Sequence, residues 1–319
     1  MKKILITGVS GFAGSFLAEL LLKKEDCDIY GTSLSDSFSA NIAHLQGKLQ
    51  LLPVDLQDFE RVKAVIGEVR PDEIYHLAAL ASPTKSFENP AHTITNNIAI
   101  EVNLFEAVKF HKLSDTKILI TSSAEVYGIV ARKDLPIDED TPLRPTSPYA
   151  VSKIAQDFLG LQYHLASSMH IIRVRPFNHI GPRQTPQFVV ARFASQIAAI
   201  EKGKAEPVIR VGNLETKRDF TDVTDMVRAY EQILEKGTAG DVYNIGSGTS
   251  HKISDILDKL LSFSTVKVTV EKDQNLFRPA DNPDLVCDCS KMRKITGWEP
   301  GVTLDETLKN ILDYWRSIG

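Results

Sequence analysis

The sequence has little cysteine. Only three of its 319 residues are of this type, namely Cys27, Cys287 and Cys289. Their number and spacing do not match a zinc site or a disulfide framework. We therefore expect reduced thiols with a structural role, and no metal centre.

Long hydrophobic runs are missing as well. No uninterrupted apolar stretch reaches the about 18 residues that a membrane span requires. The first ten residues, MKKILITGVS, begin with charge as a secretory signal does, but their apolar run is short and no small-residue cleavage site follows. Together these features predict a soluble cytoplasmic protein with no membrane partner.

The sequence also lacks an excess of positive charge. Its 37 lysine and arginine residues are scattered among 41 aspartate and glutamate residues, which gives a formal net charge of −4. A nucleic-acid-binding surface would need a basic patch, so nucleic acid is not an expected partner. An anionic ligand would have to be bound by a few local arginines.

The chain does contain a regular alternation of two kinds of segment. Aliphatic and β-branched runs at 4–7, 28–32, 49–54, 73–79, 117–123 and 171–176 alternate with segments of helical period at 15–24, 60–69, 97–110 and 149–165. This alternation predicts an α/β fold, a doubly wound parallel sheet of the Rossmann type with helices on both faces.

The alternation ends after residue 176. Because the chain is longer than one hydrophobic core usually serves, we expect a dinucleotide-binding domain over 1–176 and a smaller α/β lobe over 177–319. Residues 220–263 should partly return to the first domain, with a strand within 240–248 and a helix over 251–263. The amphipathic stretch 303–319 predicts a terminal helix that packs into the core.

A glycine-rich turn, KKILITGVSGFAG, follows the first predicted strand and opens a helix. Gly8, Gly11 and Gly14 stand where the chain must turn tightly and where backbone N–H groups must approach a pyrophosphate. A glycine pattern alone is a weak signal, but this position in an alternating fold is the context that dinucleotide binding requires.

The residues after the second strand bear on the choice between NAD and NADP. A carboxylate there binds the ribose 2′-OH of NAD, but this chain has Thr32, Ser33 and Ser35 and no acid immediately after the strand. No arginine replaces it, so the sequence favours NADPH over NADH only slightly. Asp55, after the third strand, fits equally well as an acceptor for the adenine amino group or as a helix N-cap.

Tyr149 and Lys153, in the stretch SPYAVSK, are four residues apart and Pro148 precedes them as a helix start. Residues at this spacing share one helix face. A nearby ammonium should lower the pKa of the phenol and make it a usable proton shuttle. Ser123, at the end of the preceding strand, could hydrogen-bond the substrate oxygen that the phenol serves.

Several stretches together resemble the extended short-chain dehydrogenase/reductases that act on nucleotide sugars. They are GVSGFAG, IYHLAA, TSSAEVYG, SPYAVSK and RPFNHIGPRQ, and the resemblance runs from Met1 to the GWEP stretch around Trp298. It implies an NAD(P)H-dependent enzyme whose C-terminal lobe holds a sugar nucleotide.

The resemblance implies roles for individual residues. Ser123, Tyr149 and Lys153 would form the catalytic triad, and Asn97 would be a buried asparagine associated with a helix kink and a proton relay. The expected cofactor contacts are Gly8, Gly11, Phe12, Gly14, Ser33, Asp55, Leu56, Leu77, Ala78, Ala79, Asn97, Tyr149 and Lys153. The sugar nucleotide would be bound by Asn178 and, through its diphosphate, by Arg218 and Arg278.

The segment TSSAEVYG narrows the reaction. Elimination of water from a sugar needs a base and also an acid for the departing hydroxyl. The dTDP-glucose dehydratases carry Thr-Asp-Glu where this chain has Ser123, Ala124 and Glu125, and an alanine cannot donate a proton. Glu125 fits GDP-mannose dehydratases and reductases alike, so its role as base, hydroxyl contact or structural carboxylate stays open.

The stretches NHIGPRQ (178–184) and 211–230 resemble GDP-6-deoxy-4-keto-mannose reductases more than the NHESPRR form of GDP-mannose dehydratases. The resemblance implies reduction of the C4 ketone of GDP-4-dehydro-6-deoxy-D-mannose to GDP-D-rhamnose. A GDP-mannose 4,6-dehydratase, or another nucleotide-sugar 4-epimerase or 4-reductase, is the alternative. A non-catalytic dinucleotide-sensing protein is remote, because the triad is complete.

Relatives in this family commonly dimerise through two helices that correspond to 97–110 and 149–165. Both segments carry more apolar residues than one buried stripe needs, for example Phe158, Leu159 and Leu161. We therefore expect a homodimer.

Overall fold

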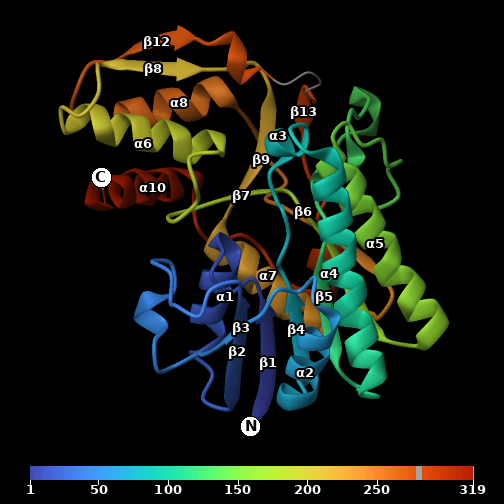
Figure 1. The fold of residues 1–319 in the computed structure, drawn as a ribbon. Coiled ribbons are helices and arrows are strands. Elements are labelled where there is room, and N and C mark those ends of the chain that lie inside the picture. Colours follow the sequence, from blue (N-terminus) through green and yellow to red (C-terminus); the bar gives the residue numbers. More distant parts are fainter. Residues whose placement is uncertain (278–281, 319) are drawn as a thin grey trace.

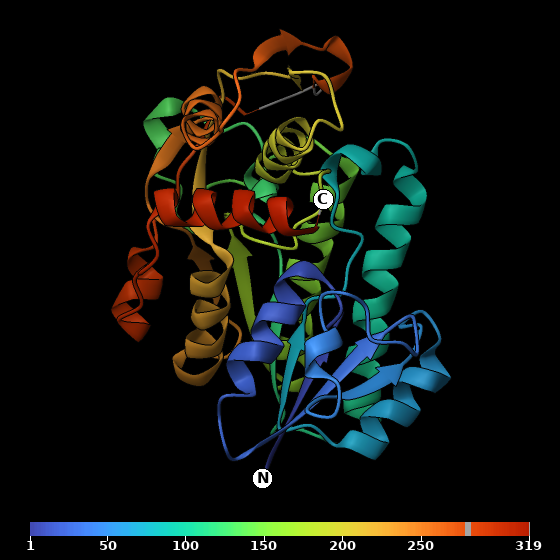
Figure 2. The ribbon, with the colours of Figure 1, turned by 90° about the vertical axis from the view of Figure 1, so that its left-hand side faces the viewer.

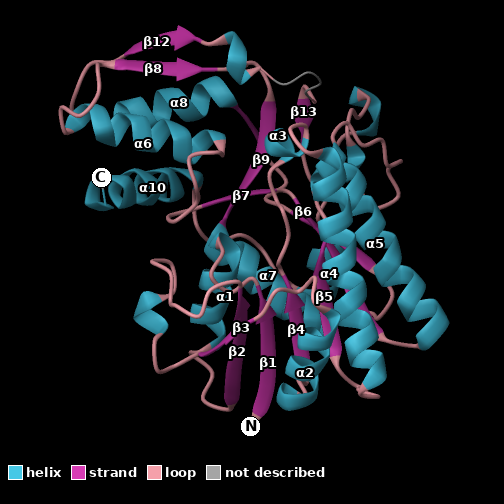
Figure 3. Cartoon of the chain, viewed as in Figure 1, coloured by secondary structure: helices cyan, strands magenta, loops and turns pink. Residues whose placement is uncertain are grey.

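The computed structural model describes residues 1–277 and 282–318. Its main sheet has seven strands in the order β10-β6-β5-β4-β1-β2-β3 (Figures 1 and 3). They are β1 (Lys2–Thr7), β2 (Cys27–Ser33), β3 (Gln50–Pro53), β4 (Glu73–His76), β5 (Lys117–Thr121), β6 (His170–Pro176) and β10 (Val242–Ile245). All neighbouring pairs are parallel. The predicted fold class is confirmed.

Helices cover both faces of this sheet because its strands are apolar on both sides. Along β1, Ile4 and Ile6 pack with α1 (Phe12–Leu21) and α7 (Val223–Lys236). Leu5 points to the opposite face, as the twofold period of a strand requires, and packs with the other helices. These are α2 (Phe59–Val69), α4 (Pro90–Phe110) and α5 (Pro148–Ser167).

The order of the sheet creates a crevice. From β1 the chain winds outward to β2 and β3, and then crosses back to β4 on the other side of β1. The loops after β1 and β4 therefore leave the sheet in opposite directions. In open α/β sheets ligands bind at the carboxyl ends of strands at this switch point.

A second group of elements lies beyond those carboxyl ends (Figure 1). A four-stranded sheet contains β11-β9-β13 with β7 paired to β9, and β8 pairs with β12. The strands are β7 (Asn178–Ile180), β8 (Val208–Val211), β9 (Lys217–Asp222), β11 (Ser250–Lys252), β12 (Thr269–Lys272) and β13 (Asp284–Leu285). Helices α6 (Val189–Glu201), α8 (Ile253–Ser262) and α10 (Leu304–Ile318) share a separate hydrophobic core, and Figure 2 shows α10 running across the middle of the molecule.

The short elements complete the chain. They are α3 (Pro83–Ser86), α9 (Ser290–Thr296) and the 3₁₀ turns η1 (Ala43–Leu45), η2 (Ala124–Tyr127), η3 (Arg132–Asp134) and η4 (Gln274–Leu276). Between the two groups of elements, β10 pairs with β6 and α7 packs on α1, so 223–245 lies with the main sheet. The domain boundaries at 176, 220 and 263 remain predictions.

Several predicted boundaries were wrong. The helix expected at 97–110 begins at Pro90, because the Asn89 side chain accepts the His92 N–H at 3.2 Å and caps it. The helix expected at 251–263 begins at Ile253, because residues 250–252 pair with β9 as a strand. The strand expected at 73–79 ends at His76, and the strand expected at 117–123 ends at Thr121.

Other expectations hold. Cys27, Cys287 and Cys289 are free thiols, and the last two are buried. In α10, Leu308, Ile311 and Leu312 are fully buried, so this helix packs into the core as predicted. Within residues 1–277 and 282–318, the helices are all too short or too polar to traverse a bilayer.

Candidate active site

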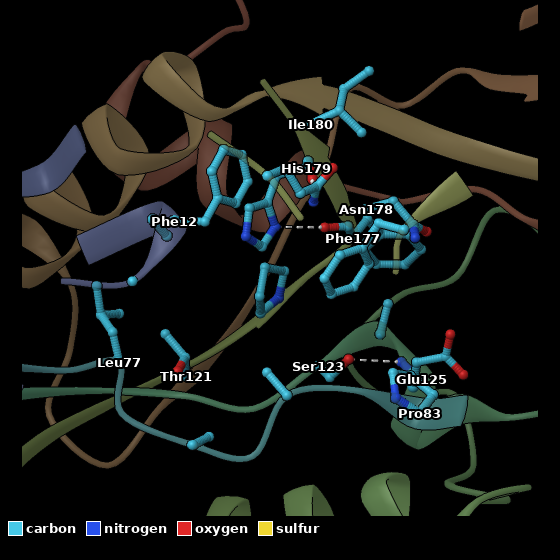
Figure 4. A pocket seen from close by; sticks show the side chains of 18 of the residues that line it. Phe12, Leu77, Pro83, Thr121, Ser123, Glu125, Phe177, Asn178, His179 and Ile180 are labelled. Atoms are coloured by element: carbon cyan, nitrogen blue, oxygen red, sulfur yellow. Dashed lines mark hydrogen bonds between the residues drawn. The ribbon is translucent and has the colours of Figure 1, made fainter. Parts of the chain in front are cut away.

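A cavity of about 390 Å³ lies where the main sheet meets the second group of elements. Its walls come from the glycine turn after β1, the ends of β4, β5 and β6, the start of α5, and the segment from β7 to α6. Figure 4 shows Phe12 and His179 on one side of it and Ser123 and Glu125 on the other. This volume falls in the range of small-molecule sites.

The glycine turn forms one wall. Gly8 has φ +70°, and a Cβ on it would lie 3.0 Å from the Ala78 Cα. A Cβ on Gly14 would lie 2.4 Å from the Gly8 carbonyl oxygen. Gly11 precedes the first turn of α1 and no side chain caps the helix there. The turn thus leaves backbone N–H groups at a helix N-terminus open to the cavity, an arrangement suited to phosphate.

The end of β4 forms the adjoining wall. The Leu77 and Ala78 N–H groups donate to Thr7 Oγ1 at 3.1 and 3.2 Å, which ends the strand. Leu77 and Ala79 line the cavity. Ala78 does not line it but packs against Gly8.

Asn97 holds the next part of this loop in place. Its Oδ1 accepts the Leu80 N–H at 2.8 Å, and its Nδ2 donates to the Leu80 carbonyl at 3.2 Å and to Ser152 Oγ at 3.0 Å. Asn97 is fully buried and does not line the cavity. Helix α4 is continuous from Pro90 to Phe110, and the kink associated with Asn97 stays a prediction. This residue therefore contributes to the site through the loop and through α5.

The residues expected around the adenosine lie at the carboxyl ends of β2 and β3. Ser33 Oγ is 3.3 Å from Ser10 Oγ of the glycine turn. Asp55 is exposed, and its carboxylate accepts the Gln57 N–H at 2.9 Å. The N-cap alternative for Asp55 was wrong, because Asp58 caps α2. Leu56 is buried in the core below.

Tyr149 and Lys153 both reach the cavity from the first turns of α5. Ser147 caps this helix by accepting the Ala150 N–H at 3.1 Å, so the helix begins at Pro148 as its sequence predicts. Tyr149 is hydrogen-bonded to Ser123, which lies after β5 and caps the 3₁₀ turn η2. The Lys153 ammonium donates to the Thr121 carbonyl at 2.8 Å and lies 5.9 Å from the centre of the Tyr149 ring.

The expected lowering of the Tyr149 pKa was wrong, because the pKa of this phenol is raised. Burial raises the pKa of the phenol above its ordinary value, Glu125 adds to this shift, and the hydrogen bond with Ser123 opposes it. Burial also lowers the pKa of Lys153 to about 8, against the influence of Glu101. The phenol is therefore protonated at neutral pH and available as a proton donor.

Ser123, Ala124 and Glu125 form the floor of the cavity at η2. Ser123 Oγ accepts the Glu125 N–H at 3.2 Å, which starts this 3₁₀ turn. All three residues line the cavity. The Ala124 methyl group stands between a hydroxyl and a carboxylate, and it provides no proton at that place.

The wall opposite η2 comes from the segment that follows β6. Asn178 lines the cavity, and next to it the His179 ring stacks on Phe12 at 5.8 Å with the two planes 3° apart. His179 Nδ1 is 3.3 Å from the Phe177 carbonyl. Burial lowers the pKa of His179, which keeps the imidazole neutral.

One of the two expected substrate arginines, Arg218, does not line the cavity. Arg218, in β9, is buried, and its Nη1 donates to the carbonyls of Lys217 and Asn282, each at 2.7 Å. Arg278 lies outside the described residues. Any diphosphate site built from this pair stays a prediction.

The cavity also has lining residues that the sequence did not reveal. They are mostly apolar or small and come from distant segments, namely Ala81, Pro83, Phe177, Gln184, Thr185, Phe188, Val189, Tyr230 and Leu285. Only the motif RPFNHIGPRQTP could have suggested some of them. In the described part of the chain no group of three or more His, Cys, Asp or Glu residues could hold a metal ion.

Comparisons with known proteins bear on this site. A family model described as GDP-mannose 4,6 dehydratase matches residues 5–311. The chain belongs to this GDP-mannose dehydratase family. The match covers nearly the whole chain, so both groups of elements and the cavity between them are included.

Members and neighbours of the family differ in their reactions. The GDP-6-deoxy-D-mannose reductase of Pseudomonas aeruginosa is 34% identical over 320 residues, with 99% of this chain and 98% of the relative covered. A GDP-mannose 4,6-dehydratase of Yersinia enterocolitica is 30% identical, with 96% and 91% covered. A solved structure of RMD from P. aeruginosa complexed with NADPH is similar at TM-score 0.84 and 33% identity, covering 99% of each chain.

These similarities confirm the resemblance to extended short-chain dehydrogenase/reductases. Like its family, this chain is an NAD(P)-dependent nucleotide-sugar oxidoreductase. The glycine turn fits a nicotinamide dinucleotide, because Gly8 and Gly14 leave no room for a side chain where the backbone must come close to a pyrophosphate. The particular sugar nucleotide and the direction of the reaction are taken up below.

Proposed function

We propose that this protein reduces the C4 ketone of GDP-4-dehydro-6-deoxy-D-mannose to the alcohol, giving GDP-D-rhamnose, with NADPH as the preferred reductant. The proposal is supported by the similarity to the P. aeruginosa reductase over the full chain. It is also supported by the side chains of the cavity, whose chemistry fits reduction better than dehydration.

The observation that carries the proposal is Ala124 in the cavity floor. A dehydratase must protonate the hydroxyl that leaves C6 and remove a proton from C5. Between Ser123 and Glu125 the floor offers only a methyl group. A carbonyl reduction needs no acid at this place, because the proton goes to the C4 oxygen.

The protonation state of Tyr149 points the same way. A reductase needs the neutral phenol as proton donor, whereas the oxidation that opens a 4,6-dehydration needs a phenolate as base. Burial raises the pKa of Tyr149, the hydrogen bond with Ser123 opposes this shift, and Glu125 adds to it. The net shift favours the form that donates a proton.

In this reaction each residue of the triad has a separate task. The bound dinucleotide supplies the hydride that arrives at C4. The Tyr149 phenol gives its proton to the C4 oxygen, and Ser123 stabilises the charge that develops on that oxygen. Lys153 would hold the nicotinamide ribose and stabilise the phenolate that remains, as its family counterparts are expected to do.

The proposed preference for NADPH over NADH depends on the residues at the end of β2. Ser10 and Ser33 pair there through their hydroxyls, and no carboxylate follows in the sequence GTSLSDS until Asp36. A 2′-phosphate would therefore not be repelled by a negative charge at the positions where an NAD-binding protein has a carboxylate. NADH is the alternative, and a competition between the two distinguishes them.

The sugar nucleotide would lie between η2 and the segment 178–189. Asn178, which lines the cavity, is proposed to bind it, and Arg218 and Arg278 are proposed to bind its diphosphate. In the structure Arg218 donates to backbone carbonyls, so its side chain would have to turn when the ligand binds. The guanine base is proposed from the similarity to GDP-sugar enzymes.

A GDP-mannose 4,6-dehydratase is the second candidate. The match to the dehydratase family model and the dehydratase relatives favour it, as does Glu125 in the cavity. A 4-epimerase is a further alternative. Both reactions return the cofactor to its starting state, whereas a reductase uses one reduced cofactor in every turnover.

The test is an assay with purified protein and two substrates. With GDP-4-dehydro-6-deoxy-D-mannose and NADPH or NADH, the account predicts loss of absorbance at 340 nm with one cofactor used for each ketone. Conversion of GDP-mannose without net use of cofactor would show a dehydratase instead. The NMR coupling of the C4 proton in the product would identify GDP-D-rhamnose or its C4 epimer.

We also propose that the protein forms a homodimer through α4 and α5. Val151, Phe158 and Leu165 are seven residues apart on α5, so they share one face, and they are 43%, 51% and 73% exposed. On α4, Phe110 is 61% exposed. The two helices lie side by side at the outer edge of the molecule (Figure 1), where a second copy could cover these side chains.

A further inference from the structure

The turn that follows β7 forms part of the wall of the substrate cavity. It consists of residues 179–184, and the Gln184 amide donates to the His179 carbonyl across it at 3.0 Å. His179, Gln184 and Thr185 all line the cavity. Arg183, which lies among them in the sequence, does not line it. Its side chain therefore has a different place in the structure.

The Arg183 side chain lies against α1. Its Nη1 donates to the Glu19 carboxylate at 2.6 Å and to Ser15 Oγ at 3.2 Å. Its guanidinium carbon lies 4.4 Å from the centre of the Phe16 ring, a distance at which a cation is attracted to the face of the ring. Arginine suits this place because its planar group can stack on a ring and donate hydrogen bonds at the same time.

The contacts on α1 are themselves held by the segment that follows β2. Arg183 Nη1 is 3.5 Å from the Asn41 carbonyl, and Asn41 Nδ2 donates to the Ser10 carbonyl of the glycine turn at 3.1 Å. The Glu19 carboxylate also contacts His44 Nε2 at 2.6 Å. The carboxylate that binds Arg183 is thus fixed from a second side.

The backbone of Arg183 needs this support. Its φ is +71°, a left-handed conformation that residues with a side chain rarely adopt. Such a conformation persists where surrounding contacts hold it in place. The side chain is only 21% exposed, so water screens its contacts with α1 less than it screens a surface ion pair.

The other contacts of this turn with its surroundings are apolar. The His179 ring stacks on Phe12 (Figure 4), and a Cβ on Gly181 would lie 2.5 Å from Val223 Cγ1. Apolar contacts are non-directional, whereas hydrogen bonds depend on angle as well as distance. Arg183 thus supplies directional contacts that fix where the turn lies on α1.

We propose that Arg183 is a positioning residue that fixes the turn 179–184 on α1, so that this wall of the cavity is in place before the sugar nucleotide binds. The inference rests on the proposed function, in which the sugar nucleotide lies between η2 and the segment 178–189. A site that is already ordered binds its ligand more tightly, because less freedom is lost on binding. Since Arg183 does not line the cavity, it acts through residues such as His179 and Gln184.

The test is Arg183→Met, which keeps an unbranched side chain and removes the guanidinium. At saturating NADPH, KM for the 4-keto sugar nucleotide should rise about three- to tenfold, as the loss of a partly shielded ion pair and hydrogen bond implies. The change in kcat should be smaller, because Ser123, Tyr149 and Lys153 lie on other elements. Amide hydrogen exchange of a peptide that covers 179–185 should become faster, because the turn opens locally.

Arg316→Met is the matched control. Arg316 pairs with Glu201 at 2.7 Å and its side chain is 29% exposed, and neither residue lines the cavity. R316M should lower the Tm but leave KM for the sugar nucleotide and the exchange of 179–185 unchanged. Unchanged KM and exchange in R183M, or equal changes in R316M, would overturn the proposal.

Glu19→Gln covers the case in which R183M does not fold. It removes the ion pair but leaves the contacts of Arg183 with Ser15 and Phe16, so KM and exchange should change in the same direction by less. A folded E19Q variant that shows neither change would count against the proposal. Arg183→Lys, which keeps a charge for Glu19 without the planar group, should show smaller changes than R183M.

Hydrogen exchange also separates this proposal from the proposed function, because it needs no turnover. If the unmodified protein reduces no 4-keto sugar nucleotide, the proposed function fails. The exchange of 179–185 in R183M compared with R316M still decides whether Arg183 fixes this wall of the cavity.

Discussion

Replacing Tyr149 by phenylalanine removes the proton donor and little else. The ring is 8% exposed and packed in the wall of the cavity, so phenylalanine fills the same volume. The phenol is hydrogen-bonded to Ser123, and the loss of one hydrogen bond costs about 1 kcal/mol of folding free energy. The variant should therefore fold and keep its cofactor site.

The effect on the reaction should be far larger. A positioned general acid contributes about 10²–10⁴-fold to a rate, which corresponds to roughly 3–5 kcal/mol of transition-state stabilisation. We expect kcat of Tyr149→Phe to fall by that factor, because phenylalanine has no proton to give to the C4 oxygen. KM and cofactor affinity should change by no more than about threefold, since neither depends on the lost proton.

The assay is steady-state consumption of NADPH with the 4-keto sugar nucleotide, together with NADPH binding by fluorescence. Ser123→Ala serves as a partner variant, because it removes the stabilising hydroxyl but leaves the phenol, and its loss of kcat should be smaller. A Tyr149→Phe variant that binds NADPH normally and retains more than about a tenth of the activity would refute the role of the phenol.

Three further predictions concern the cofactor, the dimer and the fold. Gly14→Ala should abolish NADPH binding, because its Cβ would lie 2.4 Å from the Gly8 carbonyl oxygen, whereas Gly301→Ala, whose Cβ meets nothing closer than 3.6 Å, should bind normally in the same titration. Phe158→Glu should shift the protein from dimer to monomer in analytical ultracentrifugation, since it places a charge on the exposed face of α5; an unchanged mass would exclude this face as the interface. Arg316 holds the pKa of Glu201 at about 2, below its ordinary 4.5, so this pair stabilises the fold above about pH 4.5 and loses its effect as the pH falls towards 2. The Tm of Arg316→Met should thus lie below that of the unmodified protein at pH 7, and the difference should narrow in acid; a constant difference would contradict the sign.

Most of the correct predictions came from the spacing of residues that are close together in the sequence. The glycine turn and the Tyr149–Lys153 pair depend on a few neighbouring residues, and backbone geometry alone brings these groups to one side of an element. The strands of the main sheet were predictable because they are apolar on both faces. The Asn89-Pro90 pair also marks the start of α4. The predicted helix began at residue 97 because only 97–110 was assigned to it from its apolar pattern.

The electrostatics of the site could not be read from the sequence. The prediction for the Tyr149 pKa assumed that a lysine four residues away decides it. In the folded chain burial is the largest influence and raises the pKa of the phenol, and burial depends on contacts between segments that lie far apart in the sequence.

The substrate side of the cavity was the least predictable part. Phe188 and Leu285 meet there only because β7, α6 and β13 fold over the carboxyl ends of the main sheet. Arg218 was predicted from its motif, but its side chain is held by the carbonyls of Lys217 and Asn282. The motif marks the residue without specifying the orientation of the side chain.

The most direct test of the central claim is the transfer of deuterium. Purified protein is incubated with GDP-4-dehydro-6-deoxy-D-mannose and NADPH that carries deuterium at both C4 positions of the nicotinamide, and the product is examined by NMR. Reduction at C4 predicts one deuterium at C4 of the sugar and the loss of the C4 proton signal, with one NADPH consumed per product. A sugar without deuterium, or a ketone that is not consumed, would contradict the account.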